Sequence, residues 1–535
     1  MLRSKLILAF FLISFAAQSQ VNRYFVFFKD KTGTPFTLSN PTQFLSSKSI
    51  ERRQKQNINL IEEDLPVNPT YVSQVKSTGA KTFFPSKWFN GVLIEATAST
   101  LTSVNALPFV SRTEFVAPGS KLLGGRVSKI KKQKNSSADQ PVNKSQLQQI
   151  GIDKMHGAGY RGEGISIAIF DSGYTGVNIT SPFAELFTEN RVKQTFNFVT
   201  NTASVYSSDD HGTEVLSVMA AHSSTYTGGV YKANYFLYLT EDISSEYRIE
   251  EYNWTFAAER ADSAGVDVIN SSLGYNTEFD DPIMDYQLSD LDGKTAIITK
   301  AARKAIEKGM VVVCSAGNEG NNSWKLVTPP ADAVGILAIG SINSVGSLSS
   351  FSSKGPTADG RIKPDVVALG SGTSVIKQSG SLGTASGTSL ASPLVASLAA
   401  GVWQAYPILS AHDVYEAIVL SATLAASPNN QFGFGIPHFQ AIENYLKSLS
   451  ENQEIAIFPN PVSGDSFKIK VKEPTDELVQ VAIYDTRGSR VAESQVKINW
   501  LNNPFEYDIS LLKPGIYFVQ VTSGKASTTA RIAKL

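Results

Sequence analysis

The segment Ser386-Gly387-Thr388-Ser389-Leu390-Ala391-Ser392-Pro393 decides how this chain is interpreted, because it joins a turn of small residues to an apolar run. The run from Leu390 to Val402 predicts a buried helix with Ser389 at its N-terminus. The N–H groups of a first helical turn have no intrahelical acceptor, and they favour a negative charge nearby. Gly387 has no side chain to obstruct an approaching backbone. Ser389 is therefore a candidate nucleophile, although a serine alone at this place could equally cap the helix.

Two motifs upstream favour the nucleophile. The apolar stretch from Ile165 to Phe170 predicts a buried strand that runs into Asp171, and open α/β sheets place functional groups at such strand ends. His211 begins a helical pattern, whereas the other four histidines of the chain lie in loops or near predicted helix ends. A serine hydroxyl needs a base to remove its proton and an acid to orient that base. We therefore predict Ser389 as nucleophile, His211 as base and Asp171 as the orienting acid.

These motifs resemble those of the subtilisin-type serine proteases, or subtilases, in which the triad follows the chain order Asp, His, Ser. The resemblance spans roughly Ile150 to Leu446 and implies a secreted endopeptidase that hydrolyses peptide bonds through an acyl-enzyme intermediate. The segment Glu214-Val215-Leu216-Ser217 departs from the family pattern and places bulk and charge beside the histidine. Two alternatives stay open. A catalytically inactive homologue that binds peptides is disfavoured by the complete triad, and an acid peptidase with a glutamate base is disfavoured by His211.

The resemblance also implies where substrate binds. The strand that begins at Met310 leads into Ala316-Gly317-Asn318, and Asn318 matches the asparagine that donates to the oxyanion together with the nucleophile's own N–H. The strand that begins at Val266 ends in Ser272-Leu273-Gly274, which in similar proteases pairs with the substrate backbone and walls the specificity pocket. Ala316 and Gly317 are expected in the opposite wall. Such small walls favour medium or large apolar side chains.

The rest of the pattern predicts an α/β fold with two further units. Helical patterns alternate with short apolar strands in the predicted peptidase domain, residues 146–448, which is typical of a mostly parallel sheet covered by helices on both faces. Residues 20–118 predict a small α+β module, and similar proteases carry here a propeptide that acts as an intramolecular inhibitor. Residues 119–145 are predicted as an exposed linker, and processing is expected between Gly119 and Val142.

The C-terminal residues 454–535 alternate apolar and polar side chains, which predicts a small antiparallel β-sandwich. The segment Phe458-Pro459-Asn460-Pro461 and the strand at Gly515-Ile516-Tyr517 resemble the C-terminal sorting domain of the type IX secretion system of Bacteroidetes. That resemblance implies secretion machinery as a partner. An accessory binding module, for instance for carbohydrate, is the alternative.

The N-terminus predicts the compartment. Residues 1–19 have the pattern of a signal peptide, with Arg3 and Lys5 before an apolar stretch and small residues around Ala17. No transmembrane segment is expected, because no other apolar run reaches spanning length. The protein is therefore predicted to be secreted or held at the cell surface. Cys314 is the single cysteine, so no internal disulfide can form, and we expect it to be buried and inert.

Composition narrows the partners. The chain has 48 Lys plus Arg and 48 Asp plus Glu, so no overall charge favours nucleic acid, and protein or peptide substrates are expected. Zinc is not expected, because the five histidines are scattered. The chemistry requires no cofactor. A structural calcium ion, which is common in similar proteases, stays open, since no loop shows a recognisable string of ligands; the metal-binding residues are unknown.

Overall fold

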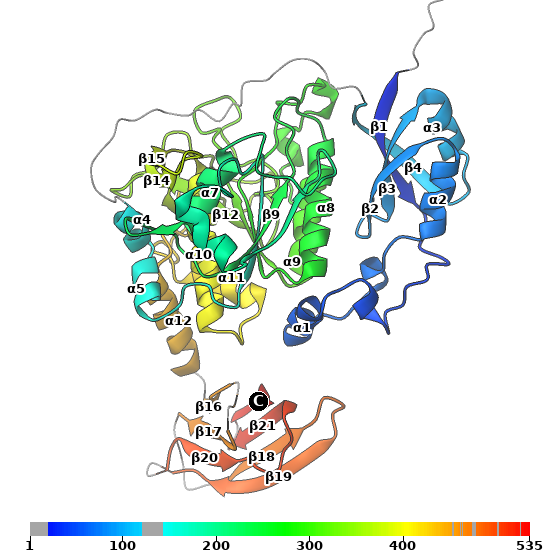
Figure 1. Cartoon of the computed structure of the whole chain (residues 1–535). Coiled ribbons are helices and arrows are strands. Elements are labelled where there is room, and N and C mark those ends of the chain that lie inside the picture. Colours follow the sequence, from blue (N-terminus) through cyan, green and yellow to red (C-terminus); the bar gives the residue numbers. More distant parts are fainter. Residues whose placement is uncertain are drawn as a thin grey trace, which may run out of the picture.

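The computed structural model describes residues 20–119, 143–451, 454–460, 462, 464–472, 474, 478–499, 502–524 and 526–534. The predicted signal peptide and most of the predicted linker lie outside the described residues. Three units follow one another along the chain (Figure 1): an α+β unit in blue, a large α/β unit, and a β unit in orange and red. Within the described ranges, no helix combines the length and the apolar character needed to cross a bilayer.

A seven-stranded parallel sheet forms the centre of the α/β unit, in the order β13-β12-β11-β10-β5-β9-β6. The strands are β5 (Ser166–Asp171), β6 (Val192–Asn197), β9 (Asn234–Leu239), β10 (Val268–Ser271), β11 (Val311–Ser315), β12 (Leu337–Ile342) and β13 (Val366–Leu369). The longer helices are α4 (Asn143–Gln149), α5 (Ile152–Gly157), α7 (His211–Ala220), α8 (Ile249–Ala264), α9 (Ile297–Glu307), α10 (Thr388–Ala405), α11 (Ala411–Leu420) and α12 (Phe439–Glu451). Shorter elements are α6 (Ala184–Thr188) and the hairpins β7 (His222–Ser223)–β8 (Tyr226–Thr227) and β14 (Thr373–Ile376)–β15 (Leu382–Ala385).

Helices cover both faces of this sheet because successive side chains of a strand point to opposite sides. In β5, Ile167 and Ile169 belong to the apolar cluster that contains α7 and α10. Ala168 and Phe170 belong to the opposite cluster, with α8 and α9. The predicted α/β class, with helices on both faces of a parallel sheet, is confirmed.

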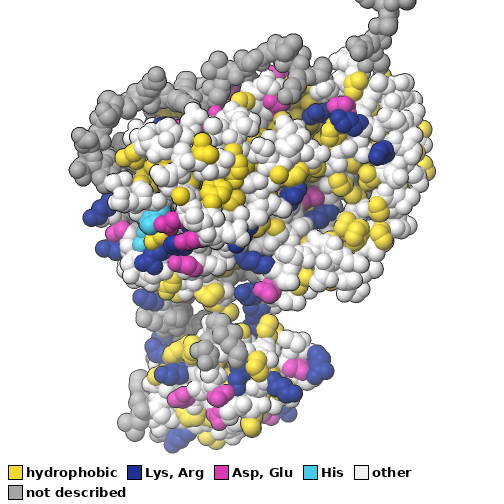
Figure 2. Space-filling model, viewed as in Figure 1, with side chains coloured by type: hydrophobic (Ala, Val, Ile, Leu, Met, Phe, Trp, Pro, Cys, Tyr) yellow, Lys and Arg dark blue, Asp and Glu magenta, His cyan; other side chains and the backbone are white. Residues whose placement is uncertain are grey.

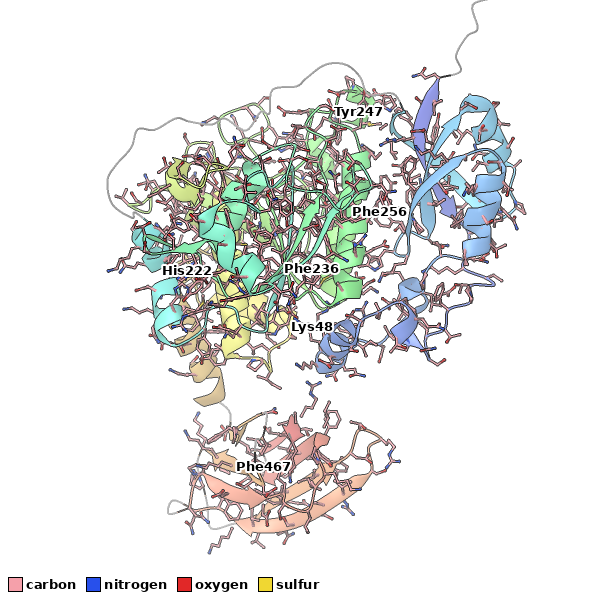
Figure 3. The ribbon with its side chains drawn as sticks, viewed as in Figure 1. Lys48, His222, Phe236, Tyr247, Phe256 and Phe467 are labelled. Carbon is pink, nitrogen blue, oxygen red and sulfur yellow. The ribbon has the colours of Figure 1, made fainter. Side chains whose placement is uncertain are left out.

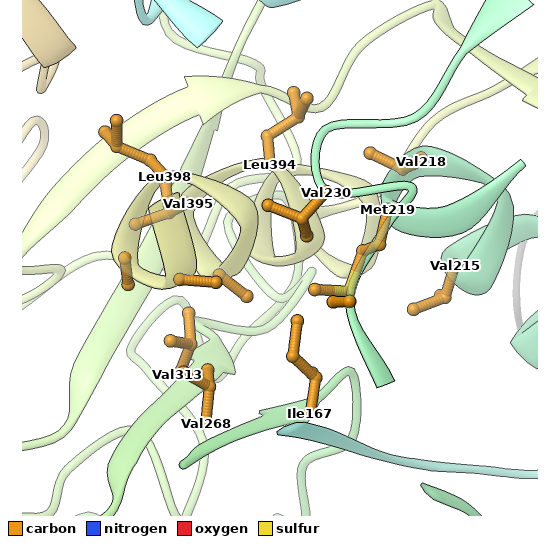
Figure 4. Packing of buried hydrophobic residues seen from close by; sticks show 14 of the residues in the cluster. Ile167, Val215, Val218, Met219, Val230, Val268, Val313, Leu394, Val395 and Leu398 are labelled. Atoms are coloured by element: carbon orange, nitrogen blue, oxygen red, sulfur yellow. The ribbon is translucent and has the colours of Figure 1, made fainter. Parts of the chain in front are cut away.

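The packing of α7 on α10 positions the candidate site. Figure 4 shows Val215, Val218 and Met219 of α7 beside Leu394 and Leu398 of α10, above strand residues of the sheet. All these side chains are fully buried. Since both helices begin at the end of the sheet where the parallel strands finish, their first residues come together there.

The N-terminal unit is a four-stranded antiparallel sheet in the order β2-β3-β1-β4 with helices on one face. Its elements are β1 (Val21–Phe28), α1 (Ser47–Lys55), α2 (Pro69–Ser77), β2 (Lys81–Ser86), β3 (Gly91–Thr97), α3 (Ala98–Asn105) and β4 (Val110–Pro118). The free face packs on α8: the ring of Phe25 stacks on Tyr252 at 4.5 Å, and Phe84 lies 5.3 Å from Phe256. Figure 3 shows Phe256 on the side of α8 that faces this unit.

The C-terminal unit contains two antiparallel sheets around one apolar cluster, in agreement with the predicted sandwich. The strands are β16 (Ile455–Phe458), β17 (Ser466–Val471), β18 (Leu478–Tyr484), β19 (Arg490–Lys497), β20 (Phe505–Asp508), β21 (Gly515–Ser523) and β22 (Ala526–Lys534). On the face of the molecule shown in Figure 2, acidic and basic side chains are interspersed, and neither sign prevails.

Candidate active site

Asp171 and His211 are in direct contact at the C-terminal end of β5. His211 Nδ1 lies 2.7 Å from Asp171 Oδ1, which also accepts a hydrogen bond from the backbone N–H of Ser172 at 2.8 Å. Gly212 permits this approach, because a Cβ atom there would lie 2.5 Å from the carbonyl oxygen of Gly173. Asp171 is fully buried and His211 nearly so. The aspartate therefore holds the imidazole by one nitrogen and leaves Nε2 for another partner.

The charge around His211 favours the imidazolium. Burial alone would lower the pKa of His211, but the carboxylates of Asp171 and Glu214 raise it, to about 9. Glu214 lies one turn along α7 and pairs with Lys377 Nζ at 2.7 Å. The carboxylate of Glu214, which the sequence places beside the histidine, is thus buried and forms an ion pair with Lys377.

Ser389 is the second residue of α10, where its backbone N–H has no acceptor one turn back. Its carbonyl oxygen accepts a hydrogen bond from Ser272 Oγ at 2.9 Å, which ties the start of the helix to the end of β10. Among the residues described, His211 Nε2 has no hydrogen-bond partner, so a hydrogen bond to Ser389 Oγ is not formed. Such bonds are often long without substrate and tighten when it binds.

Asn318 lies beside Ser389 and is oriented by the preceding residue of α10. Its Oδ1 accepts hydrogen bonds from Thr388 N at 2.9 Å and Thr388 Oγ1 at 3.0 Å. A Cβ placed on Gly387 would lie 2.7 Å from Ser389 Oγ and 3.7 Å from Asn318 Nδ2, so both atoms border the same small space. Since Oδ1 is engaged by Thr388, the Nδ2 donor of this exposed side chain is available to a ligand.

The two segments predicted to bind substrate approach each other through Thr328. A Cβ on Gly274 would lie 2.1 Å from Thr328 Oγ1, and one on Gly317 would lie 2.9 Å from the same atom. Gly317 has a φ of +107°, which favours glycine. Ser272 and Ala316 are buried, Leu273 is half-buried and Gly274 is exposed. Sequence reasoning missed Thr328, because nothing in the local pattern marks it.

Sequence reasoning also missed a group of acids near this site. Glu241, Glu246 and Glu250 each have one carboxylate oxygen within 4.8 Å of an oxygen of the other two. The group could hold a metal ion. The spacing of glutamates after the apolar strand at β9 was the available signal, but it matches no standard ligand string.

Comparison with known proteins assigns all three units. The model of the subtilase family matches residues 162–435, that of the peptidase S8 propeptide domain of Bacteroidota matches residues 23–139, and that of a secretion system C-terminal sorting domain matches residues 456–534. The resemblances inferred from the sequence are thereby confirmed.

Several curated proteins are similar to the central part of the chain. Subtilisin from Bacillus pumilus is 31% identical over 299 residues, which covers 55% of this chain and 96% of that protein. Subtilisin E from Bacillus subtilis is 30% identical over 298 residues, with 55% and 70% covered. Among solved structures, the MycP3 protease from the type VII (ESX-3) secretion system is 20% identical with a TM-score of 0.47, over 58% of this chain and 90% of that one.

Proposed function

This chain belongs to the subtilase family, and we propose that Asp171, His211 and Ser389 are the catalytic triad of a secreted endopeptidase. The observation that carries the proposal is the 2.7 Å contact between Asp171 and His211, which leaves His211 Nε2 without a hydrogen-bond partner among the described residues. Family membership supports peptide hydrolysis as the reaction.

In the proposed reaction, His211 Nε2 removes the proton of Ser389 Oγ as that oxygen attacks the scissile carbonyl carbon. The same nitrogen then gives the proton to the departing amine, and an acyl-enzyme remains. Asp171 stays ionised, orients the ring through Nδ1 and stabilises the imidazolium. Water attacks the acyl-enzyme in the second half, with His211 again as base.

Asn318 is the proposed side-chain donor to the oxyanion. Its Nδ2 borders the space next to Ser389 Oγ, and the hydrogen bonds from Thr388 orient the amide before substrate arrives. The N–H of Ser389 is the second donor. Preorganised donors of this kind stabilise the charge that develops only in the transition state.

Two strand ends are proposed to bind the substrate chain. Ser272-Leu273-Gly274 pairs with its backbone and forms one wall of the specificity pocket, and Ala316-Gly317 forms the other. The glycines support this role, because they leave space that a side chain would fill. We therefore expect a preference for medium or large apolar residues before the cleaved bond.

The two flanking units are proposed to control the export of the enzyme and the onset of its activity. Residues 20–118 act as an intramolecular inhibitor until the linker at 119–145 is cut, which is supported by their extensive contacts with α8. The C-terminal unit directs export through type IX machinery, and the enzyme acts on proteins outside the cell or at its surface. Retention of the unit with affinity for a ligand would favour the accessory-module alternative instead.

The test compares Ser389→Ala with Ser397→Ala, since both serines are buried in α10 and only Ser389 borders the site. Ser389→Ala is expected to lose roughly 10⁶ in turnover on casein, as the equivalent change does in a subtilisin, and to lose labelling by a fluorophosphonate probe. Ser397→Ala is expected to keep both. Unlabelled, inactive wild-type protein after processing would favour the peptide-binding homologue.

A further inference from the structure

Three glutamates meet where the loop after β9 enters α8. The loop contains Tyr247, which Figure 3 labels near the N-terminal end of the helix. One carboxylate oxygen from each of Glu241, Glu246 and Glu250 lies within 4.8 Å of the other two. Oxygens that bind one Ca²⁺ at about 2.3–2.6 Å are separated from each other by at most about 5 Å. The spacing of the three oxygens therefore fits a shared cation.

Glu250 supplies an oxygen that the protein itself does not satisfy. This residue is 1% exposed, and its Oε1 accepts a hydrogen bond from the N–H of Asp242 at 2.9 Å. Its Oε2 is buried and has no hydrogen-bond partner within the described part of the chain. An ionised oxygen in that situation is costly unless a positive charge compensates it.

The charged groups around Glu250 increase this cost. One oxygen each of Glu246 and Glu241 lies within 4.8 Å of an oxygen of Glu250, and carboxylates this close repel one another when ionised. Arg248 is the basic residue of the loop, and its guanidinium donates to the carbonyl of Met284 at 2.8 Å and lies 4.7 Å from the ring of Tyr286. It is thus engaged away from the glutamates.

Hydrogen bonds hold the carboxylates in place. Tyr275 Oη donates to both oxygens of Glu241, at 2.8 Å and 2.9 Å, and Thr240 Oγ1 donates to one of them at 3.0 Å. Asp242 fixes Glu250 in the same way. Partners of this kind orient metal ligands before the ion binds.

We propose that Glu241, Glu246 and Glu250 bind one divalent cation, of which Ca²⁺ is the best match. All three ligands are oxygen donors, which suit hard cations, and calcium tolerates the irregular geometry of a loop and a helix end. This site goes beyond the proposed peptidase function, and water completes its coordination.

The ion lies between two parts of the proposed active site. The N–H of Thr240 donates to the carbonyl of Asp171 at 3.1 Å. Tyr275, which holds Glu241, directly follows Ser272-Leu273-Gly274 in the chain. A cation that cross-links residues 240–250 therefore stabilises both the end of β5 and the segment Ser272-Leu273-Gly274, which is proposed to bind substrate.

Metal binding is measured on the full chain carrying Ser389→Ala, so that the chain stays intact during titration. We expect calorimetry to give one Ca²⁺ per chain, and Tb³⁺ to show luminescence excited through tyrosine, because Tyr275 touches a ligand. Glu250→Gln should abolish both signals. Tyr275→Phe should weaken Ca²⁺ binding about 10- to 100-fold, the usual effect of losing a group that orients a ligand. The control Glu416→Gln changes a half-buried acid of α11 outside this cluster and should bind as the parent does.

Thermal unfolding separates a ligand from a merely structural carboxylate. In EDTA, Glu250→Gln should melt at the same temperature as the parent or higher, because it removes repulsion among the glutamates. In saturating Ca²⁺ the order should reverse, since only the parent gains binding free energy. The proposal would be overturned by any of three results: a lower melting temperature of Glu250→Gln than of the parent in EDTA, no Ca²⁺ binding by the parent, or unchanged Ca²⁺ binding by Glu250→Gln. Selective binding of lysine- or arginine-containing peptides by the Ser389→Ala chain would also overturn it, if Glu250→Gln abolished that binding and Ca²⁺ had no effect on it. None of these readouts depends on catalysis, so failure here leaves the peptidase proposal intact.

Discussion

We expect the binding of the propeptide to the peptidase unit to depend on Asp262 of α8. Its carboxylate is fully buried and accepts from three propeptide cations: Arg52 at 2.6 Å, Arg53 at 2.7 Å and Lys87 at 2.8 Å. Burial alone would raise the pKa of Asp262, but these charges hold it well below its usual range. The contribution of Asp262 is therefore complete above about pH 4 and is lost only in much stronger acid, so mild acidification should not release the propeptide through this residue.

Asp262→Ala leaves three buried cations without this common partner. Removing one member of a buried ion pair costs about 3–5 kcal/mol, which corresponds to roughly 100- to 4,000-fold weaker binding of the propeptide. The partly exposed pair between Lys48, which Figure 3 labels, and Asp267 offers a control at the same interface. Its lysine side chain is 37% exposed and its aspartate side chain 13%. An exposed pair contributes about 0–1 kcal/mol, so Lys48→Ala should weaken binding by about 5-fold or less.

The assay measures inhibition of the mature enzyme by residues 20–118, supplied as a separate chain that has its own apolar core. Asp262→Ala should raise the inhibition constant by the larger factor and leave kcat and KM unchanged. Within the described residues, every hydrogen bond and ion pair of its side chain is with the propeptide. Equal effects of Asp262→Ala and Lys48→Ala would refute the argument that burial makes the network strong.

Two further predictions concern catalysis. Asn318→Ala should lower kcat by about 10²- to 10³-fold with little change in KM, as loss of the corresponding donor does in a subtilisin. Steady-state kinetics would measure this loss, with Asn321→Ala as the control. An effect confined to KM would contradict the role of Asn318 as an oxyanion donor. Glu214→Gln removes a charge that raises the pKa of His211, so the acidic limb of the pH profile of kcat/KM should move to lower pH. A limb that stays in place or moves to higher pH would show that Glu214 does not act on the histidine.

The sequence alone predicted the elements that end in functional residues. Asp171 closes an apolar strand, His211 opens one helix and Ser389 opens another, and these placements follow from local periodicity and from turn residues. The α/β class followed for the same reason, since buried parallel strands are continuous apolar runs. The family resemblance depended on motifs of this local kind, and so did the two flanking units.

What only the tertiary structure decided depends on segments that are distant in the chain. Thr328 lies between Gly274 and Gly317, Asp262 meets cations some two hundred positions before it, and Glu250 faces Glu241 across a loop turn. The local sequence around such a residue is the same whether its side chain is paired with a charged group, is protonated or is hydrated. Its partner is determined by which distant surfaces the packed helices and strands bring into contact, and burial then decides how strongly the pair interacts.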